Sequence, residues 1–348
     1  MILAGITGTT MDLETESLIN DYKVGGIILY ANNLIDSSQG VKFLNEIKAK
    51  NESQNKSPLL LGVDQEGGRV SKLPNEVVKL PTNKVIGSYN NSDLSFELGS
   101  VLGEQVKTFG FNVNFAPVLD INSNPKNPVI GDRSFGNDLD LVTELGIQTM
   151  KGIQSQNVIS VVKHFPGHGD TALDSHFGLP EVNKTLDELR SFELIPFEQA
   201  IKEGADAVMV AHILLPNIDA NFPSSMSRPI ITDLLRNKLG FDGVVMTDDM
   251  TMHAITNHFD IGQASVESIK AGSDIIMVAH NYSNVITVIE SIKSAIQNNE
   301  ITEERINTSV KRIQQLKQKY EVTDNKVIEA DIKKLNETTT NKLSEYIK

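Results

Sequence analysis

Residues 243–248 read Gly-Val-Val-Met-Thr-Asp, a short apolar run that ends in a carboxylate. Seven other segments follow the same plan, in which apolar or β-branched residues lead to a polar or ionisable one. They are residues 2–5, 26–30, 59–64, 112–115 (with Asp120 just beyond), 158–164, 207–212 and 275–280. Nearly all of these runs lack apolar/polar alternation, which predicts strands buried on both faces of a parallel sheet.

Most of the connections between these runs carry helical patterns. Thr185 and Glu188 form a capping box that predicts a helix through Phe192, and Thr302 is placed to cap another helix. Alternating strands and helices predict either a (β/α)8 barrel or an open doubly wound sheet. No Gly-x-Gly-x-x-Gly follows a strand, and polar residues at strand ends suit a barrel, whose sites gather at the carboxyl ends of its strands.

We therefore predict an α/β fold with a single (β/α)8 TIM-type barrel over residues 1–320. Its first βα unit is expected to be irregular, because the first connection is short. Residues 321–348 are polar with scattered apolar positions, which predicts a C-terminal helical tail packed on the outside of the barrel.

Composition excludes several classes of protein. The 348 residues include 32 Lys and Arg against 45 Asp and Glu, with no basic block, so no nucleic-acid partner is expected. Cysteine is absent, which excludes disulfides and thiolate chemistry. No apolar run reaches the roughly 18 residues of a membrane span, and no signal peptide is recognisable near the first residues. A monomeric cytoplasmic enzyme without a membrane partner is the expectation.

The densest group of ionisable residues lies in residues 163–176. Lys-His-Phe-Pro-Gly-His-Gly-Asp at 163–170 is followed by Asp174-Ser175-His176, so three of the seven histidines fall close together. One interpretation is a zinc site, although proline and glycine between the first two histidines break the helical spacing that such a pair prefers. Its candidate ligands are His164, His168 and His176 with Asp170 or Asp174.

A second interpretation of this loop is acid–base chemistry. Asp174 lies two residues before His176, and that spacing lets a carboxylate hold one ring nitrogen while the other faces a substrate. A third is purely structural, since turn-forming residues dominate the segment.

Three further residues at predicted strand ends or in loops are candidates. Asp248 is placed to act as a nucleophile, a base or an ion-pair partner, or merely to precede a helix that Asp249 would cap. Asp64, before two glycines, and Arg133, in Gly-Asp-Arg-Ser-Phe-Gly, suit recognition of hydroxyl and amide groups, or could form loop salt bridges.

These motifs, taken in order, resemble family 3 glycoside hydrolases, and more narrowly their bacterial β-N-acetylglucosaminidase branch. The matching segments are VDQEGGRV (63–70), APVLD (116–120), GDRSFG (131–136), KHFPGHGD (163–170) with DSH (174–176), and GFDGVVMTDDM (240–250). The resemblance implies a (β/α)8 barrel and hydrolysis with retention of anomeric configuration.

The resemblance also implies roles for individual residues. Asp248 would be the nucleophile, His176 the acid/base and Asp174 its orienting partner. The residues that would grip a terminal N-acetylglucosamine are Asp64, Lys72, Arg133, Lys163 and His164. Position 72 is usually Arg in this family, and the Lys found here keeps the charge but loses the bidentate fork.

The leading hypothesis is thus an exo-acting β-N-acetylglucosaminidase that removes GlcNAc from muropeptides in peptidoglycan turnover, with no cofactor and no resident metal. A phosphorylase on the same scaffold is the alternative, because a neutral imidazole would admit phosphate in place of water. A zinc-dependent hydrolase and a sugar-binding protein that has lost catalysis are the hypotheses from other classes.

Overall fold

Eight parallel strands close into a barrel, in which each strand pairs with the next along the chain and the last pairs with the first. The computed structural model describes residues 1–54 and 57–347. The barrel strands are β1 (Ile2–Gly5), β2 (Gly26–Leu29), β3 (Leu60–Val63), β6 (Val113–Asn114), β7 (Ile159–Phe165), β8 (Ala207–Val210), β9 (Val244–Asp249) and β10 (Ile275–Val278). All eight predicted strands are confirmed, and the closed order excludes the open doubly wound sheet.

Both faces of the strands are buried, which explains the missing alternation in the sequence. One cluster of buried side chains takes members from every barrel strand, including Leu3, Leu60, Val161 and Met246, and such a cluster can form only inside the barrel. Neighbouring strand residues such as Leu61 pack instead with residues of the surrounding helices. Burial on both sides favours apolar and β-branched residues throughout each strand.

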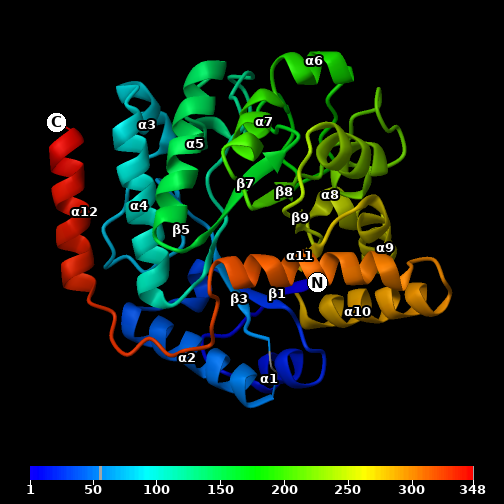
Figure 1. Ribbon diagram of the computed structural model, residues 1–348, viewed down its shortest axis with the longest axis horizontal. Helices are drawn as coiled ribbons and strands as arrows, with labels where there is room; N and C mark the ends of the chain where they lie inside the picture. Colours follow the sequence, from blue (N-terminus) through cyan, green and yellow to red (C-terminus); the bar gives the residue numbers. More distant parts are fainter. Residues whose placement is uncertain (55–56, 348) are drawn as a thin grey trace.

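Helices surround the barrel (Figure 1). They are α1 (Leu13–Asn20), α2 (Ser37–Gln54), α3 (Asn83–Tyr89), α4 (Ser92–Phe109), α5 (Leu139–Ser155), α6 (Leu186–Ser191), α7 (Ile195–Lys202), the π-helix η4 (Pro229–Lys238), α8 (His253–Thr256), α9 (Ile261–Ala271), α10 (Tyr282–Gln297), α11 (Glu303–Lys319) and α12 (Ile332–Tyr346), with short 3-10 turns η1 (Ala31–Asn33), η2 (Gly131–Arg133) and η3 (Ser224–Met226). The capping box of Thr185 and Glu188 is present, although α6 ends before Phe192. Thr302 caps α11 as predicted. A helix, α1, follows β1, so the first unit keeps the βα order.

The long connection from β3 to β6 contains a small hairpin that the sequence did not predict. Strand β4 (Gln65–Gly67) pairs antiparallel with β5 (Val70–Ser71). Gly67 and Gly68 have φ angles of 98° and 53°, a region that side chains disfavour. The two glycines therefore allow the tight turn that places Asp64 and Glu66 just beyond a barrel strand.

The C-terminal segment crosses the outside of the barrel before it forms α12, which lies beside α4 (Figure 1). The side chain of Asn336 accepts a hydrogen bond from the Val78 amide at 2.9 Å and donates to the Glu76 carbonyl at 2.7 Å. Lys342 pairs with Glu97 at 2.6 Å. A boundary between barrel and tail at residue 320 stays a prediction.

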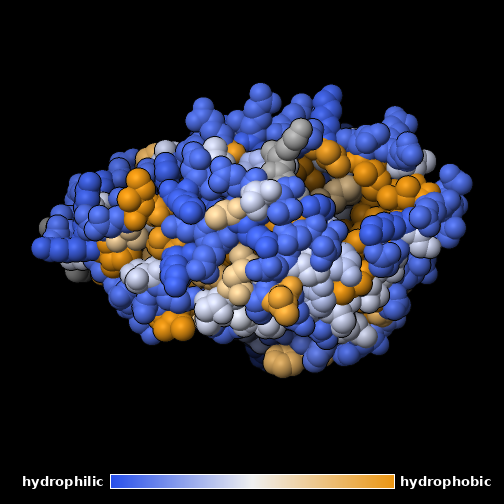
Figure 2. Space-filling view, turned by 90° about the horizontal axis from the view of Figure 1, so that it is seen from below, coloured by the Kyte–Doolittle hydropathy of each residue, from blue (hydrophilic) through white to orange (hydrophobic). Residues whose placement is uncertain are grey.

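Hydrophilic side chains dominate the face seen in Figure 2, and apolar ones gather there in separate patches. Among the described residues, none of the helices combines the length and the apolar character needed to cross a bilayer.

Candidate active site

A pocket of about 390 Å³ opens where the barrel strands end at their carboxyl termini. All of the site residues predicted from the sequence line it, although they come from six different segments of the chain. They are Asp64, Lys72, Arg133, Lys163, His164, Asp174, His176 and Asp248. Parallel strands place their carboxyl ends at one end of a barrel, so this convergence follows from the fold.

The organising anion of the pocket is Glu66, which sequence reasoning missed. Its side chain is only 2% exposed, and it lies in β4 beside Asp64. The Arg133 guanidinium donates to both carboxylate oxygens, at 2.9 Å from Nε and 2.7 Å from Nη2. The ammonium of Lys163 lies 2.6 Å from the same carboxylate. Burial alone would raise the pKa of Glu66, but these two cations hold it far below its usual range.

Lys163 connects Glu66 to the predicted sugar-binding residue Asp64. Its Nζ lies 2.7 Å from Asp64 Oδ1, and the lysine side chain is only 3% exposed at the end of β7. Burial would lower the pKa of this ammonium, but the two carboxylates raise it above its ordinary value. Lys163 is therefore a permanent cation, and Asp64, which is more exposed, keeps an oxygen available to a ligand in the pocket.

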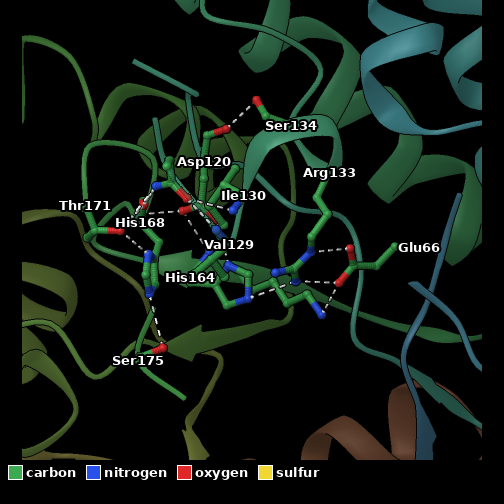
Figure 3. Close-up of polar contacts among 12 residues, drawn as sticks. Glu66, Asp120, Val129, Ile130, Arg133, Ser134, His164, His168, Thr171 and Ser175 are labelled. Carbon is green, nitrogen blue, oxygen red and sulfur yellow. Dashed lines mark hydrogen bonds and ion pairs between the residues drawn. The ribbon is translucent and has the colours of Figure 1, made fainter. Parts of the chain in front are cut away.

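A second carboxylate, Asp120, fixes His164 (Figure 3). Asp120 is fully buried and lies 2.6 Å from His164 Nδ1. The pKa of Asp120 is lowered because the two nearby histidines and the hydrogen bonds that it accepts outweigh its burial. The other ring nitrogen, Nε2, lies 3.3 Å from Arg133 Nη2. Because a guanidinium can only donate, His164 carries its proton on Nδ1 and accepts at Nε2.

Asp248 lies in β9, partly buried at the floor of the pocket. Its Oδ1 accepts a hydrogen bond from the Asp249 amide at 2.8 Å. Burial opposes ionisation, but His212, His164, that amide and Lys163 together lower the pKa of Asp248 below its usual value. The carboxylate is therefore ionised at neutral pH. His212 also donates from Nε2 to the Asp249 carbonyl at 3.0 Å, which anchors the peptide next to Asp248.

The prediction that Asp249 caps the following helix is wrong. Asp249 is the last residue of β9, and α8 begins after Met252. The Asp249 carboxylate instead accepts hydrogen bonds from the Thr251 amide at 2.9 Å and from the Ala279 amide at 2.8 Å. It ties β9 to the end of β10, which fixes the peptide that carries Asp248.

Asp174 and His176 form the contact that their spacing allows. Asp174 Oδ1 lies 2.8 Å from His176 Nδ1 and accepts the His176 amide at 2.9 Å. The imidazole side chain is 65% exposed, and its Nε2 is left to face a ligand. A carboxylate on one nitrogen and a free second nitrogen is the arrangement that proton transfer requires.

The loop histidines do not gather as metal ligands. His168 is buried and uses both ring nitrogens, with Thr171 at 2.8 Å and Ser175 at 3.3 Å. His164 has its nitrogens against Asp120 and Arg133. Across residues 1–54 and 57–347, no group of three or more His, Cys, Asp or Glu side chains is arranged to hold a metal ion.

Sequence reasoning missed Glu66, Asp120, His212 and Tyr30 as parts of the site. Glu66 and Asp120 stand within the segments VDQEGGRV and APVLD, but their partners lie 67 and 44 residues away along the chain. Tyr30 stacks on His280 in the pocket wall, with ring centroids 5.3 Å apart. No spacing along the sequence points to that contact between β2 and β10.

Comparisons with known proteins identify relatives of the chain. Residues 3–316 match the glycosyl hydrolase family 3 N-terminal domain. Beta-hexosaminidase A from Pseudoalteromonas piscicida is 36% identical over 334 residues, which cover 89% of this chain but only 56% of that protein. A beta-hexosaminidase from Nitrosomonas eutropha is 33% identical over 298 residues, 84% of each chain.

Solved structures show the same relationship. The family 3 β-N-acetylglucosaminidase from Paenibacillus sp. FPU-7 superposes with a TM-score of 0.92 at 38% identity, over 99% of this chain and 67% of that one. The family match spans nearly the whole barrel and a relative is 33% identical over 84% of each chain, so the chain belongs to glycoside hydrolase family 3.

Proposed function

We propose that the protein is a retaining exo-β-N-acetylglucosaminidase that removes terminal GlcNAc from peptidoglycan-derived muropeptides. The observation that carries the proposal is that an ionised carboxylate, Asp248, and a hydrogen-bonded Asp174–His176 pair line one pocket. The hexosaminidase names of the relatives support the choice of sugar. The proposal that the sugar is removed from a muropeptide rests on the resemblance to the bacterial β-N-acetylglucosaminidase branch of the family.

The first step uses the two groups together. Asp248 attacks the anomeric carbon and forms a glycosyl ester, while His176 gives the proton on Nε2 to the departing oxygen. Asp174 accepts a hydrogen bond from His176 Nδ1 and stabilises the imidazolium form before the proton transfer. The transition state resembles an oxocarbenium ion, so a nearby carboxylate lowers its energy.

The second step runs through the same groups in reverse order. His176, now neutral, takes a proton from water, and the water oxygen attacks the anomeric carbon of the ester. The C–O bond to Asp248 breaks, which regenerates the carboxylate and retains the anomeric configuration. An imidazole can both donate and accept a proton, so one residue can serve both steps.

The remaining pocket residues would hold the sugar. Asp64, Arg133, Lys163 and His164 present charged and neutral hydrogen-bonding groups that suit ring hydroxyls and an acetamido group. Lys72 lines the same pocket and would add a single cation at its edge. An imidazole in the acid/base position lacks the negative charge of a carboxylate that would repel phosphate, which supports a phosphorylase as the second candidate.

One experiment tests the reaction, the sugar and the acceptor together. Nitrophenyl β-N-acetylglucosaminide and nitrophenyl β-glucoside are compared with and without inorganic phosphate. The proposal predicts rapid release of nitrophenol from the acetamido sugar and free GlcNAc as product, unaffected by phosphate. GlcNAc-1-phosphate as the product would establish the phosphorylase, and a preference for the glucoside would overturn the choice of sugar.

A further inference from the structure

Ser175 lies between the two residues of the proposed acid/base pair and lines the same pocket, but it is far less exposed than His176. It is only 2% exposed, whereas the side chain of His176 is 65% exposed. Its hydroxyl and its carbonyl both make hydrogen bonds to residues outside the Asp174–His176 pair. The contacts of Ser175 therefore determine where the imidazole stands.

The backbone of Ser175 is held by the segment that follows the nucleophile strand. Its carbonyl accepts a hydrogen bond from the Ala254 amide at 3.1 Å. Ala254 is in the first turn of α8, shortly after Asp248 and Asp249 at the end of β9. The loop that carries the acid/base is thereby attached to the element that follows the nucleophile.

The hydroxyl of Ser175 is held by His168, 3.3 Å away at Nε2 (Figure 3). Thr171 determines which atom donates. Thr171 Oγ1 donates its proton to the His168 carbonyl at 3.0 Å and must therefore accept from His168 Nδ1 at 2.8 Å. Burial lowers the pKa of His168 to about 4, so the ring is neutral at pH 7. With its proton on Nδ1, the ring accepts a hydrogen bond at Nε2 from the Ser175 hydroxyl.

His168 is in turn fixed to the sugar-binding cluster, which is formed by the predicted sugar-binding residues Asp64, Arg133, Lys163 and His164. Its amide donates to Asp120 Oδ1 at 2.6 Å, and the other oxygen of that carboxylate holds His164 Nδ1. His164 then contacts Arg133. A Cβ at the next residue, Gly169, would lie 1.7 Å from the Ile121 carbonyl, so the chain approaches the Asp120 segment too closely for any side chain.

We propose that Ser175 is a positioning residue for the acid/base: its hydroxyl bond to His168 and its carbonyl bond to Ala254 hold the Asp174–His176 pair at the sugar-binding cluster. This inference rests on the proposed function. Ser175 thereby fixes the backbone of the loop, while the side chain of His176 stays 65% exposed.

The test separates protonation of the leaving group from general structural damage. Ser175→Ala is compared with the unmodified chain on N,N′-diacetylchitobiose, whose leaving group needs a proton, and on 2,4-dinitrophenyl β-N-acetylglucosaminide, whose leaving group does not. The measured quantity is kcat/KM, which reports the first chemical step. Ser268→Ala is the matched control, because Ser268 is also fully buried and its hydroxyl also makes one hydrogen bond, to Ala264.

We expect Ser175→Ala to lose roughly tenfold on the disaccharide, the effect of one misplaced hydrogen-bonded group. Its loss on the dinitrophenyl substrate should stay within about twofold. Ser268→Ala should treat the two substrates alike. Ser175→Cys keeps the size and a weaker donor; it should show a smaller loss in the same direction and serves as the test if the alanine variant does not fold.

Equal losses on the two substrates, or no loss on either, would overturn the positioning role. That result differs from failure of the proposed function, in which the unmodified chain itself would cleave neither substrate.

Discussion

Replacing Glu66 by Gln should lower the free energy of unfolding far more than the same replacement at an exposed ion pair. Glu66 is 2% exposed and faces both Arg133 and Lys163. A glutamine side chain is nearly isosteric with glutamate, but it would leave two buried cations with one carboxylate fewer. Breaking a buried ion pair from one side typically costs about 3–5 kcal/mol. Lys163 keeps Asp64 at 2.7 Å, so the lower end, about 3 kcal/mol, applies.

That free energy corresponds to a measurable shift in melting temperature. Unfolding entropies near 2.1 cal/mol/K per residue give roughly 0.7 kcal/mol/K for 348 residues. A loss of about 3 kcal/mol therefore lowers Tm by about 4 °C. Because Arg133 and Lys163 would also lose their fixed orientation, KM for the nitrophenyl acetamido substrate should rise as well.

The control is Glu198→Gln. Glu198 pairs with Lys202 at 2.8 Å, a distance like those at Glu66, but its side chain is 38% exposed. Exposed pairs contribute at most about 1 kcal/mol, so this variant should melt within about 1 °C of the unmodified chain and keep its activity. Calorimetry and steady-state kinetics measure both variants. Equal Tm shifts in the two variants would refute the argument that burial of Glu66 sets the size of the effect.

Three other outcomes follow from the same geometry. Asp248→Ala should abolish turnover, and a 2-fluoro sugar with an activated leaving group should label Asp248 in the unmodified chain; a label on any other residue in the peptide mass analysis would contradict the nucleophile assignment. His176→Ala should lose about 10²–10⁴ in kcat/KM on a disaccharide and much less on a dinitrophenyl substrate, and equal losses would show that His176 is not the acid. The free energy of unfolding should fall as the pH drops below about 6.5, because burial holds the pKa of His168 at about 4 and the unfolded chain binds a proton there first. The fall should steepen below about pH 4.5. In that range Glu66 and Asp120 are protonated in the unfolded chain, whereas the folded state depresses their pKa values. Urea titrations at several pH values measure this, and a stability that is flat from about pH 7 to about pH 5 would contradict it.

The barrel was predictable because burial on both faces gives each strand an apolar sequence of its own. A strand covered by helices outside and by the packed barrel interior inside must be apolar along its whole length, and eight such runs are visible in the sequence. Strands β4 and β5 have no such apolar run in the sequence. They are only 3 and 2 residues long, and the polar side chains of Gln65 and Glu66 are buried by hydrogen bonds and ion pairs instead of apolar contacts.

The candidate site was predictable to the extent that its residues stand at strand ends or next to each other. Asp248 follows an apolar run, and Asp174 and His176 are two residues apart, so local spacing indicated both. By contrast, Glu66 is 67 residues from its partner Arg133, and the partner of Asp120 is 44 residues away along the chain. Contacts over such distances depend on the closure of the barrel, which no local pattern encodes.

The charges of the pocket explain why a buried carboxylate, Glu66, is needed beside the more exposed Asp64. Two cations, Arg133 and Lys163, would neutralise Asp64 and Asp248 alone, and Asp248 would then serve as an ion-pair partner. Glu66 takes contacts from both cations at 2.7 and 2.6 Å. In the part of the chain that the structure describes, no salt bridge engages Asp248, so its charge remains directed at the pocket. Asp64, Glu66 and Asp248 against Arg133 and Lys163 leave one excess negative charge among these five residues of the pocket, which favours the positive charge that develops at the anomeric carbon of a sugar.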